Sequence, residues 1–452
     1  MSKFYPFRRR ASAGVALVTA CVLCAATLIM PPAAVFSQAA ARQQSAPVAA
    51  VNPKSAAVAA ATAEVLGETS KIRQLGVLRE VKSGAQSRAD IEQMLVRNLD
   101  ENATPAELRA SELALKKLGL APADFQFRSF VVKLLTEQVA GYYDPKTQFF
   151  YLADWIAVEA QKPVIAHELT HALQDQHFDL RRFEKWPQGD ADAELAAHAL
   201  VEGDAMLTMT FYVLRNPAAA LGMLQAMGAA GSATEQLDRA PRALRETLLF
   251  PYQHGLTWAT QVQRRGGWAA LSAAYKDLPQ STEQILHTEK YFARESPQKI
   301  ELPDIAGALG KGWKRIDHDI NGEWSYYLIL DEYLKNENES RAAAAGWGGD
   351  RYAVYEYARS GEVMLTQSTV WDTEEDAREF FNAYAKRTGL RYKDASFLAP
   401  TAESAGESRR AWRTSEGVVN LERRGTRVII LEGVPANVRA DKLLKQIWGP
   451  AR

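Results

Sequence analysis

Apolar residues follow two different spacings along this chain, and the change comes near residue 346. From about residue 65 they recur at the three- and four-residue intervals of helices that bury one face. Thr104, Pro105 and Glu107 form a capping box with proline in the first turn, and this helix is predicted to end at Gly119. A second helix is predicted over residues 125–139. The first part of the chain is therefore expected to be mostly helical.

One β-hairpin interrupts this helical pattern. Aromatic residues flank the turn-forming sequence Asp144-Pro145-Lys146-Thr147, and this arrangement is typical of a hairpin. The hairpin comes shortly before the helix that carries the strongest chemical signal in the chain. We therefore expect a small sheet beside that helix.

Strand-like alternation begins after the glycine-rich sequence GWGGDRY. The elements that follow have the order ββαββα, which favours a small α+β sandwich. Strands are predicted over 352–357, 363–371, 409–413 and 418–431, the last range containing a turn at 423–426, and helices over 373–387 and 440–448.

The chain divides into four predicted parts. Residues 1–39 are an N-terminal export segment, and residues 40–64 are a linker rich in Ala, Gln, Ser, Pro and Val that lacks the residues for a core. Residues 65–345 form the mostly helical domain and residues 346–452 the C-terminal domain. The predicted fold class is α+β.

The N-terminal segment has the features of a signal peptide. Lys3 and the arginines at 8–10 precede an uncharged run over residues 11–30, and Ser37-Gln38-Ala39 fits a cleavage site. Two alternatives remain: the run is long enough to stay as a membrane anchor, and Cys21 loosely fits a lipoprotein box. The protein is therefore expected to be exported, to the periplasm or the medium, with a membrane tether through residues 11–30 as the alternative.

Charge and cysteine content narrow the function classes. The 54 basic residues balance 54 acidic ones, so we expect no nucleic-acid partner. Both cysteines, Cys21 and Cys24, lie in the export segment. A cleaved product would therefore contain neither a disulfide nor a cysteine-ligated metal.

A candidate metal site begins in the sequence PVIAHELTHALQDQHF, residues 163–178, which holds three of the chain's seven histidines. On a helix, His167 and His171 are four residues apart and leave the same face, as two zinc ligands must. Glu168 is rotated by about 100° from His167 and is placed to reach a metal-bound water as a general base. The cofactor predicted is zinc.

The third zinc ligand has several candidates. His177 lies ten residues after His167, but on a continuous helix it is rotated by about 240° from His171. A glycine at position 174 would let the chain turn and bring His177 back towards the metal, but this chain has Gln174 there. The remaining candidates share one face of a predicted second helix; they are Glu194, His198 and Glu202.

Glu202 is the predicted third ligand, which gives the metal set His167, His171 and Glu202. A glutamate from a second helix is the arrangement of thermolysin-like gluzincins. Gly203 follows it inside the helix, where glycine suggests close approach of another element. Thermolysin-like enzymes often place an aspartate four residues after this ligand, whereas this chain has Met206 there, and Asp204 is the nearest substitute.

Several motifs together resemble a group of uncharacterised exported bacterial proteins regarded as predicted zinc metallopeptidases of the gluzincin type. The resemblance rests on GYYDPKTQFFYL, AHELTHALQDQHF and ALVEGDA and continues through FPYQHG, STEQILH and GWGGDRY, so it covers roughly residues 81–352. It implies a zincin fold for the mostly helical domain. In the zincin class a strand beside the active helix pairs with extended substrate, and residues 148–153 are the expected counterpart.

These observations predict an exported zinc metallopeptidase that acts on a peptide or protein substrate, with Glu168 as general base. The alternative is a non-catalytic binding or scaffold protein of the cell envelope that keeps a zincin fold. Tyr252 and His254 are candidate donors to the oxyanion of the transition state.

Three further groups of polar residues are more simply explained by structure than by chemistry. Glu283 and His287 have helical spacing, but such pairs are usually solvated or capping. Asp317-His318-Asp319 is predicted to be a polar loop, and Asp350 with Arg351 is expected to anchor the C-terminal domain.

Overall fold

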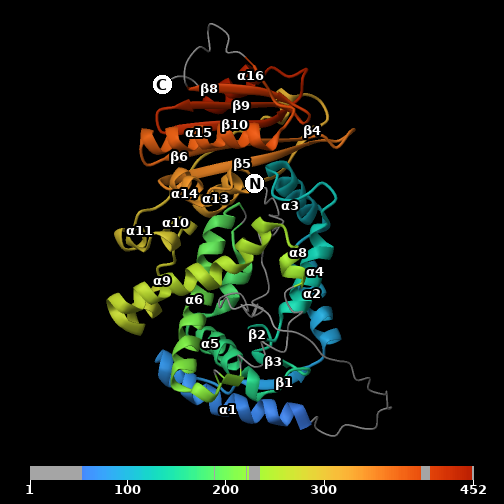
Figure 1. Cartoon of the computed structure of the whole chain (residues 1–452). Coiled ribbons are helices and arrows are strands. Elements are labelled where there is room, and N and C mark those ends of the chain that lie inside the picture. Colours follow the sequence, from blue (N-terminus) through green and yellow to red (C-terminus); the bar gives the residue numbers. More distant parts are fainter. Residues whose placement is uncertain (1–52, 188, 220, 223–234, 399–407, 450–452) are drawn as a thin grey trace, which may run out of the picture.

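The computed structural model describes residues 53–449 apart from residues 188, 220, 223–234 and 399–407. The predicted export segment, including the anchor and lipidation alternatives, lies outside the described residues, as does the linker up to residue 52. Within the described ranges, no helix has both the length and the apolar character needed to cross a membrane. The fold is mixed α+β, as the sequence predicted (Figure 1).

Helices make up most of the chain before residue 300. The predicted capping box is present, because Thr104 and Glu107 bond reciprocally and Gly119 ends the helix at φ 73°. The helices of this part are α1 (Pro53–Arg73), α2 (Arg88–Asn102), α3 (Pro105–Leu118), α4 (Phe127–Gln138), α5 (Lys162–Phe178), α6 (Ala191–Arg215), α8 (Glu235–Arg239), α9 (Arg242–Ala274), α10 (Thr282–Leu286) and α11 (Thr288–Ala293), with short 3₁₀ turns η1 (Glu159–Gln161) and η2 (Leu180–Lys185).

Helix α1 corrects the predicted linker. Residues 53–64, assigned from composition to a disordered segment, form the first half of this helix. Val58, Ala61 and Val65 are buried along one side of α1, which packs on α5. Alanine is the strongest helix former, so an alanine-rich segment with a few valines at helical spacing is helical once a neighbour covers that side.

A three-stranded sheet lies beside α5 and has the order β1-β3-β2 (Figure 1). The hairpin strands are β2 (Gly141–Asp144) and β3 (Phe149–Ala153), as predicted, and β1 (Lys82–Gln86) is parallel to β3. The expectation that residues 148–153 pair with substrate is wrong, because β1 and β2 take up both edges of β3. In this sheet β2 is the strand nearest α5.

The second sheet is antiparallel, has seven strands and the order β4-β5-β6-β10-β9-β8-β7. Helices α13, α14 and α15 cover one face and α12 with α16 the other, so the predicted sandwich is confirmed in outline. The bounds are β4 (Trp313–Asp319), β5 (Trp347–Tyr357), β6 (Val363–Trp371), β7 (Ser396–Phe397), β8 (Arg409–Thr414), β9 (Gly417–Arg424), β10 (Arg427–Val434), α12 (Ala306–Leu309), α13 (Gly322–Leu334), α14 (Glu337–Ala344), α15 (Glu374–Arg391) and α16 (Ala440–Trp448).

Strand β4 was not predicted from the sequence. Asp317, His318 and Asp319 lie in this strand rather than in a polar loop. β4 is an edge strand, and edge strands often carry charged residues, which hide the apolar alternation of a strand. The sheet therefore extends past the predicted domain boundary at residues 345 and 346 towards the N-terminus.

Helices α6 and α9 cross in backbone contact. A Cβ atom at Gly203 would lie 2.2 Å from the carbonyl oxygen of Gly255, and one at Gly255 would lie 2.3 Å from that of Ala199. The sequence-based interpretation of Gly203 is thus confirmed. The crossing fixes the part of α6 that carries Glu202.

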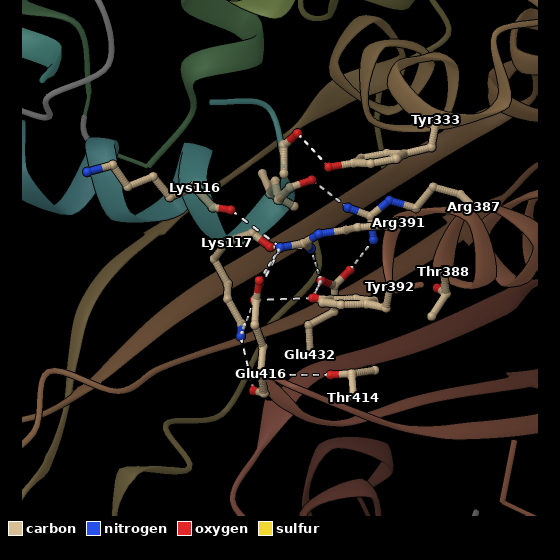
Figure 2. Close-up of polar contacts among 12 residues, drawn as sticks. Lys116, Lys117, Tyr333, Arg387, Thr388, Arg391, Tyr392, Thr414, Glu416 and Glu432 are labelled. Atoms are coloured by element: carbon tan, nitrogen blue, oxygen red, sulfur yellow. Dashed lines mark hydrogen bonds and ion pairs between the residues drawn. The ribbon is translucent and has the colours of Figure 1, made fainter. Parts of the chain in front are cut away.

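An arginine cluster joins the seven-stranded sheet to the end of α3 (Figure 2). Arg387 and Arg391 of α15 bind the fully buried carboxylate of Glu432 at 2.6 and 2.7 Å. Arg387 Nη2 and Arg391 Nη1 also donate to the carbonyls of Leu118 and Lys117, which a helix C-terminus leaves without partners. The sheet therefore holds α3 in place.

Candidate metal centre

Three electron-rich atoms meet between α5 and α6. The Nε2 atoms of His167 and His171 are 3.0 Å apart, and the Oε2 atom of Glu202 lies 3.1 Å from the first and 3.4 Å from the second. A tetrahedral zinc holds such ligands at about 2.0–2.1 Å, which places the ligand atoms about 3.3 Å from one another. The three sides of this triangle therefore match one face of a zinc tetrahedron.

The electrostatics of the triangle call for a positive charge at its centre. Burial acts to lower the pKa of His171, but the carboxylate of Glu202 outweighs burial and raises this pKa to about 9. Burial lowers the pKa of His167, whereas the two histidines hold the pKa of Glu202 well below its usual range. A buried carboxylate that stays ionised is compensated here by a proton or by a metal ion.

A chain of hydrogen bonds orients His171. Its Nδ1 atom lies 2.8 Å from Oε1 of Gln174, whose amide nitrogen donates to the carbonyl of Val201 and to Asp204. Because both N–H donors of this amide are used, Oε1 can only accept, so the proton lies on Nδ1 of His171 and the unprotonated Nε2 faces the triangle. Gln174 stands where a glycine would have let the chain turn to bring His177 back, and in the structure it orients His171 instead.

Asp204 is the charged end of this chain. It forms a 2.5 Å ion pair with Arg73, and both side chains are fully buried. Tyr275 donates a further hydrogen bond to it at 2.9 Å. The predicted substitute for the missing aspartate at position 206 therefore does support His171, but it does so through Gln174 instead of directly.

Glu168 is buried and is held by the neighbouring sheet. Its Oε2 atom accepts a hydrogen bond of 2.8 Å from the backbone N–H of Tyr143 in β2. The Tyr143 hydroxyl donates to Asp175. Asp175 lies one helical turn after His171 and on the same face of α5. Strand β2 thus fixes the carboxylate one residue away from the first histidine.

The competing ligand candidates lie elsewhere. Helix α5 continues through Gln174 to Phe178, so His177 is turned away from the triangle; it is exposed and donates from Nε2 to the carbonyl of Gly76. His198 and Glu194 lie on the same side of α6 as Glu202 but are not within ligand distance of the triangle. Among the described residues, the structure therefore brings together the three ligands that the sequence predicted.

A cavity of about 550 Å³ opens beside the triangle. Apolar side chains of α3, α4 and α9 form much of its wall, and Glu202 with Tyr252 lies at one end. The Tyr252 ring packs against the His167 ring at a centroid distance of 6.3 Å. His254 packs instead against Phe250 and Trp324, so Tyr252 is the better placed of the two candidate oxyanion donors.

The other polar groups singled out in the sequence have structural partners. His287 contacts Glu323 at 2.9 Å, and Glu283 binds Lys290. Glu283, Glu295 and Asp372 do cluster, but Lys290 lies within 2.7 Å of all three and supplies the positive charge.

Asp350 and Arg351 anchor β5, as expected. Asp350 accepts hydrogen bonds from the backbone N–H groups of Asn321 and Gly322, at the start of α13. Arg351 donates to the carbonyl of Gly189, just before α6.

Sequence reasoning missed the residues that support the site. The contacts of these residues join positions at least 25 apart: Arg73 with Asp204, Tyr143 with Glu168, and Gln174 with Asp204. The exception is the contact between Gln174 and His171, which are three residues apart. That contact had a local signal, because this spacing puts Gln174 on the same side of the helix as His171.

Comparisons with known proteins cover only the C-terminal part of the chain. Residues 311–443 match the model of a domain of unknown function, DUF8575. This range begins just before β4 and so agrees with the extent of the seven-stranded sheet. Searches of curated proteins and of solved structures found no significant match.

Proposed function

We propose that the protein is an exported zinc-dependent metallopeptidase of the zincin type. The observation that carries this proposal is the convergence of His167 Nε2, His171 Nε2 and Glu202 Oε2 at zinc-ligand spacing. Two nitrogens and one carboxylate oxygen are a donor set that suits zinc and leaves a fourth position for water or substrate. Export rests on the N-terminal segment alone.

Glu168 provides a general base, which a purely structural zinc site would not need. When bound, zinc would polarise the scissile carbonyl and lower the pKa of a water molecule towards neutrality. The Glu168 carboxylate, held by the Tyr143 N–H, is positioned to take a proton from that water and pass it to the leaving amine. Gln174 keeps His171 in the tautomer that faces the metal.

The cavity beside the triangle supports a substrate of peptide size. Its volume of about 550 Å³ is in the range of sites that bind organic ligands, and its walls are mainly apolar. Tyr252, whose ring stacks against that of His167 at a centroid distance of 6.3 Å, is the candidate donor to the developing oxyanion.

One observation favours the alternative of a non-catalytic binding protein that keeps the fold. Strand β3 has no free edge to pair with an extended substrate, because β1 and β2 flank it. An extended substrate could then pair only with the outer edge of β1 or β2, or be held by the cavity walls.

The test is zinc content together with cleavage of a peptide library, for the wild type and for Glu168→Gln. We expect about one zinc per chain in both proteins and cleavage by the wild type alone, with the variant slower by about 10²–10⁴-fold. A protein that binds no zinc refutes the metal site. A protein that binds zinc and cleaves nothing supports the binding alternative.

A further inference from the structure

The cavity has a second group of polar lining residues, and Glu194 among them lies eight residues, or about 12 Å of helix, before Glu202. Glu194, His198 and Glu202 are spaced four residues apart on α6 and all three line the cavity. Eight residues of helix rise by about 12 Å, which equals three to four residues of extended peptide. Strand β4 adds Asp317 and Asp319 to the polar lining residues.

Glu194 differs from the carboxylates around it. It is 4% exposed, and across the described residues no hydrogen bond or ion pair reaches its carboxyl group. Its neighbours are satisfied: Asp319 accepts from two backbone N–H groups, and Asp192 accepts from the hydroxyl and N–H of Thr282. Among the described residues, the carboxyl oxygens of Glu194 are not among the fully enclosed polar atoms without a partner, so they open into the cavity, where a ligand can reach them.

Acidic neighbours make this part of the cavity attractive to a positive charge. Burial, Asp319 and Asp190 raise the pKa of Glu194 to about 8. The pKa of Asp319 is raised to about 7, mainly by burial. An incoming cation would compensate these groups and allow them to ionise.

One arginine, Arg315, lines the cavity, and a second, Arg351, lies against the lining residue Gly189. Arg315 lies 3.9 Å from Asp304, and Arg351 donates to the carbonyl of Gly189. Neither forms an ion pair with Glu194, so the positive charge that Glu194 lacks is not supplied by these side chains.

The shape of the cavity indicates which kind of cation fits. The acidic residues do not converge at metal-ligand spacing, since the metal-compatible clusters in the described ranges lie elsewhere. The path from the triangle is lined by apolar residues such as Leu195, Leu244 and Leu328. An organic cation on an apolar stem matches both features.

We propose that Glu194, with Asp319 beside it, binds a protonated amine or guanidinium group of the substrate, three to four residues from the bond that is cleaved. The group is a lysine or arginine side chain or the amino terminus of a peptide. This inference rests on the proposed function where it concerns cleavage, whereas binding of the cation stands on the cavity alone.

Binding of short peptides to the Glu168→Gln protein tests the proposal without cleavage. The probes are N-acetylated peptide amides with one arginine at each position in turn, the same peptides with citrulline, and unblocked peptides without arginine. Calorimetry should show at least one arginine peptide, or an unblocked peptide, binding about tenfold or more tightly than its neutral counterpart. The two arms identify the side chain or the amino terminus as the source of the cation.

The double variant Glu168→Gln/Glu194→Gln should lose this preference, whereas Glu168→Gln/Glu289→Gln, which removes a 79% exposed carboxylate outside the cavity, should keep it. Equal binding of charged and neutral peptides, no binding of any charged peptide, or a preference that survives Glu194→Gln would each overturn the proposal. If the protein binds no zinc but prefers charged peptides in a way that depends on Glu194, only the peptidase function is refuted. If it cleaves peptides with zinc but shows no preference for charged peptides, only the cation site is refuted.

Discussion

Two clusters of buried charged residues differ in where their compensating charge comes from. In the arginine cluster, Arg387 and Arg391 surround the buried carboxylate of Glu432 with permanent positive charge. In the metal triangle, the buried carboxylate of Glu202 faces two imidazoles. The first cluster is complete within the chain, whereas the second is completed by a proton or a metal ion. A buried charge therefore does not by itself indicate a binding site. A buried carboxylate without a permanently charged partner in the chain, such as Glu202, is the stronger indication.

Removal of the Glu432 carboxylate should give the largest effect on folding. Glu432→Ala leaves two arginines buried without an anion and should lower the free energy of unfolding by about 3–5 kcal/mol. Denaturant unfolding measures this. Glu416 is the matched control in Figure 2, since it binds Arg391 but is 43% exposed, and Glu416→Ala should cost less than about 1 kcal/mol. Equal losses would contradict the distinction between the two carboxylates.

Removal of the Glu202 carboxylate should instead abolish tight zinc binding. Glu202→Ala should weaken zinc binding by more than the roughly 100-fold that an outer partner of a ligand contributes. His177→Ala should leave the affinity unchanged, because His177 points to Gly76. Titration against a competing chelator measures both. The reverse result would make His177 the third ligand.

Gln174 should have a smaller effect on the same affinity. Gln174→Leu removes the acceptor that orients His171 and should weaken zinc binding by about 10–100-fold. Gln174→Glu keeps an acceptor at this position and should restore much of the loss. A leucine variant that binds zinc as tightly as the wild type would show that packing alone orients His171.

The effect expected at Glu194 vanishes at low pH, and its sign is opposite to that at Glu432. A pKa raised from 4.5 to about 8 means that the folded protein keeps a proton that the unfolded chain releases, so Glu194 costs stability progressively as pH rises from about 4.5 to 8. Glu194→Gln should therefore stabilise the ligand-free protein by up to about 4 kcal/mol near pH 8 and by little near pH 4. Thermal unfolding at both pH values, with Glu289→Gln as control, decides this.

Local signals predicted much of this molecule. The capping box at Thr104, the turn after Asp144 and the two-histidine spacing of α5 depend on residues within a few positions of one another, and all three appear in the structure. The choice of Glu202 was helped by Gly203, whose lack of a side chain is visible in the sequence although its partner Gly255 is not.

Non-local contacts could not be predicted in the same way. Residues 53–64 are helical because α5 covers Val58 and Ala61, and composition alone does not show that partner. Strand β4 is defined by its pairing with β5, which compensates for its polar sequence. The hydrogen bond from Tyr143 to Glu168 depends on how the hairpin packs on α5, which the sequence of either element leaves open.

The ion pair between Arg73 and Asp204 joins positions 131 residues apart and so bears on the order in which the molecule assembles. Helix α1 leaves the ribosome well before α6, and contacts between distant segments form late because closing a long loop costs entropy. Until α1 docks, Asp204 lacks its buried counter-charge, and the hydrogen bonds from Gln174 to His171 lack their anchor. The hydrogen-bond chain that orients His171 should therefore be complete only after the distant segments have come together.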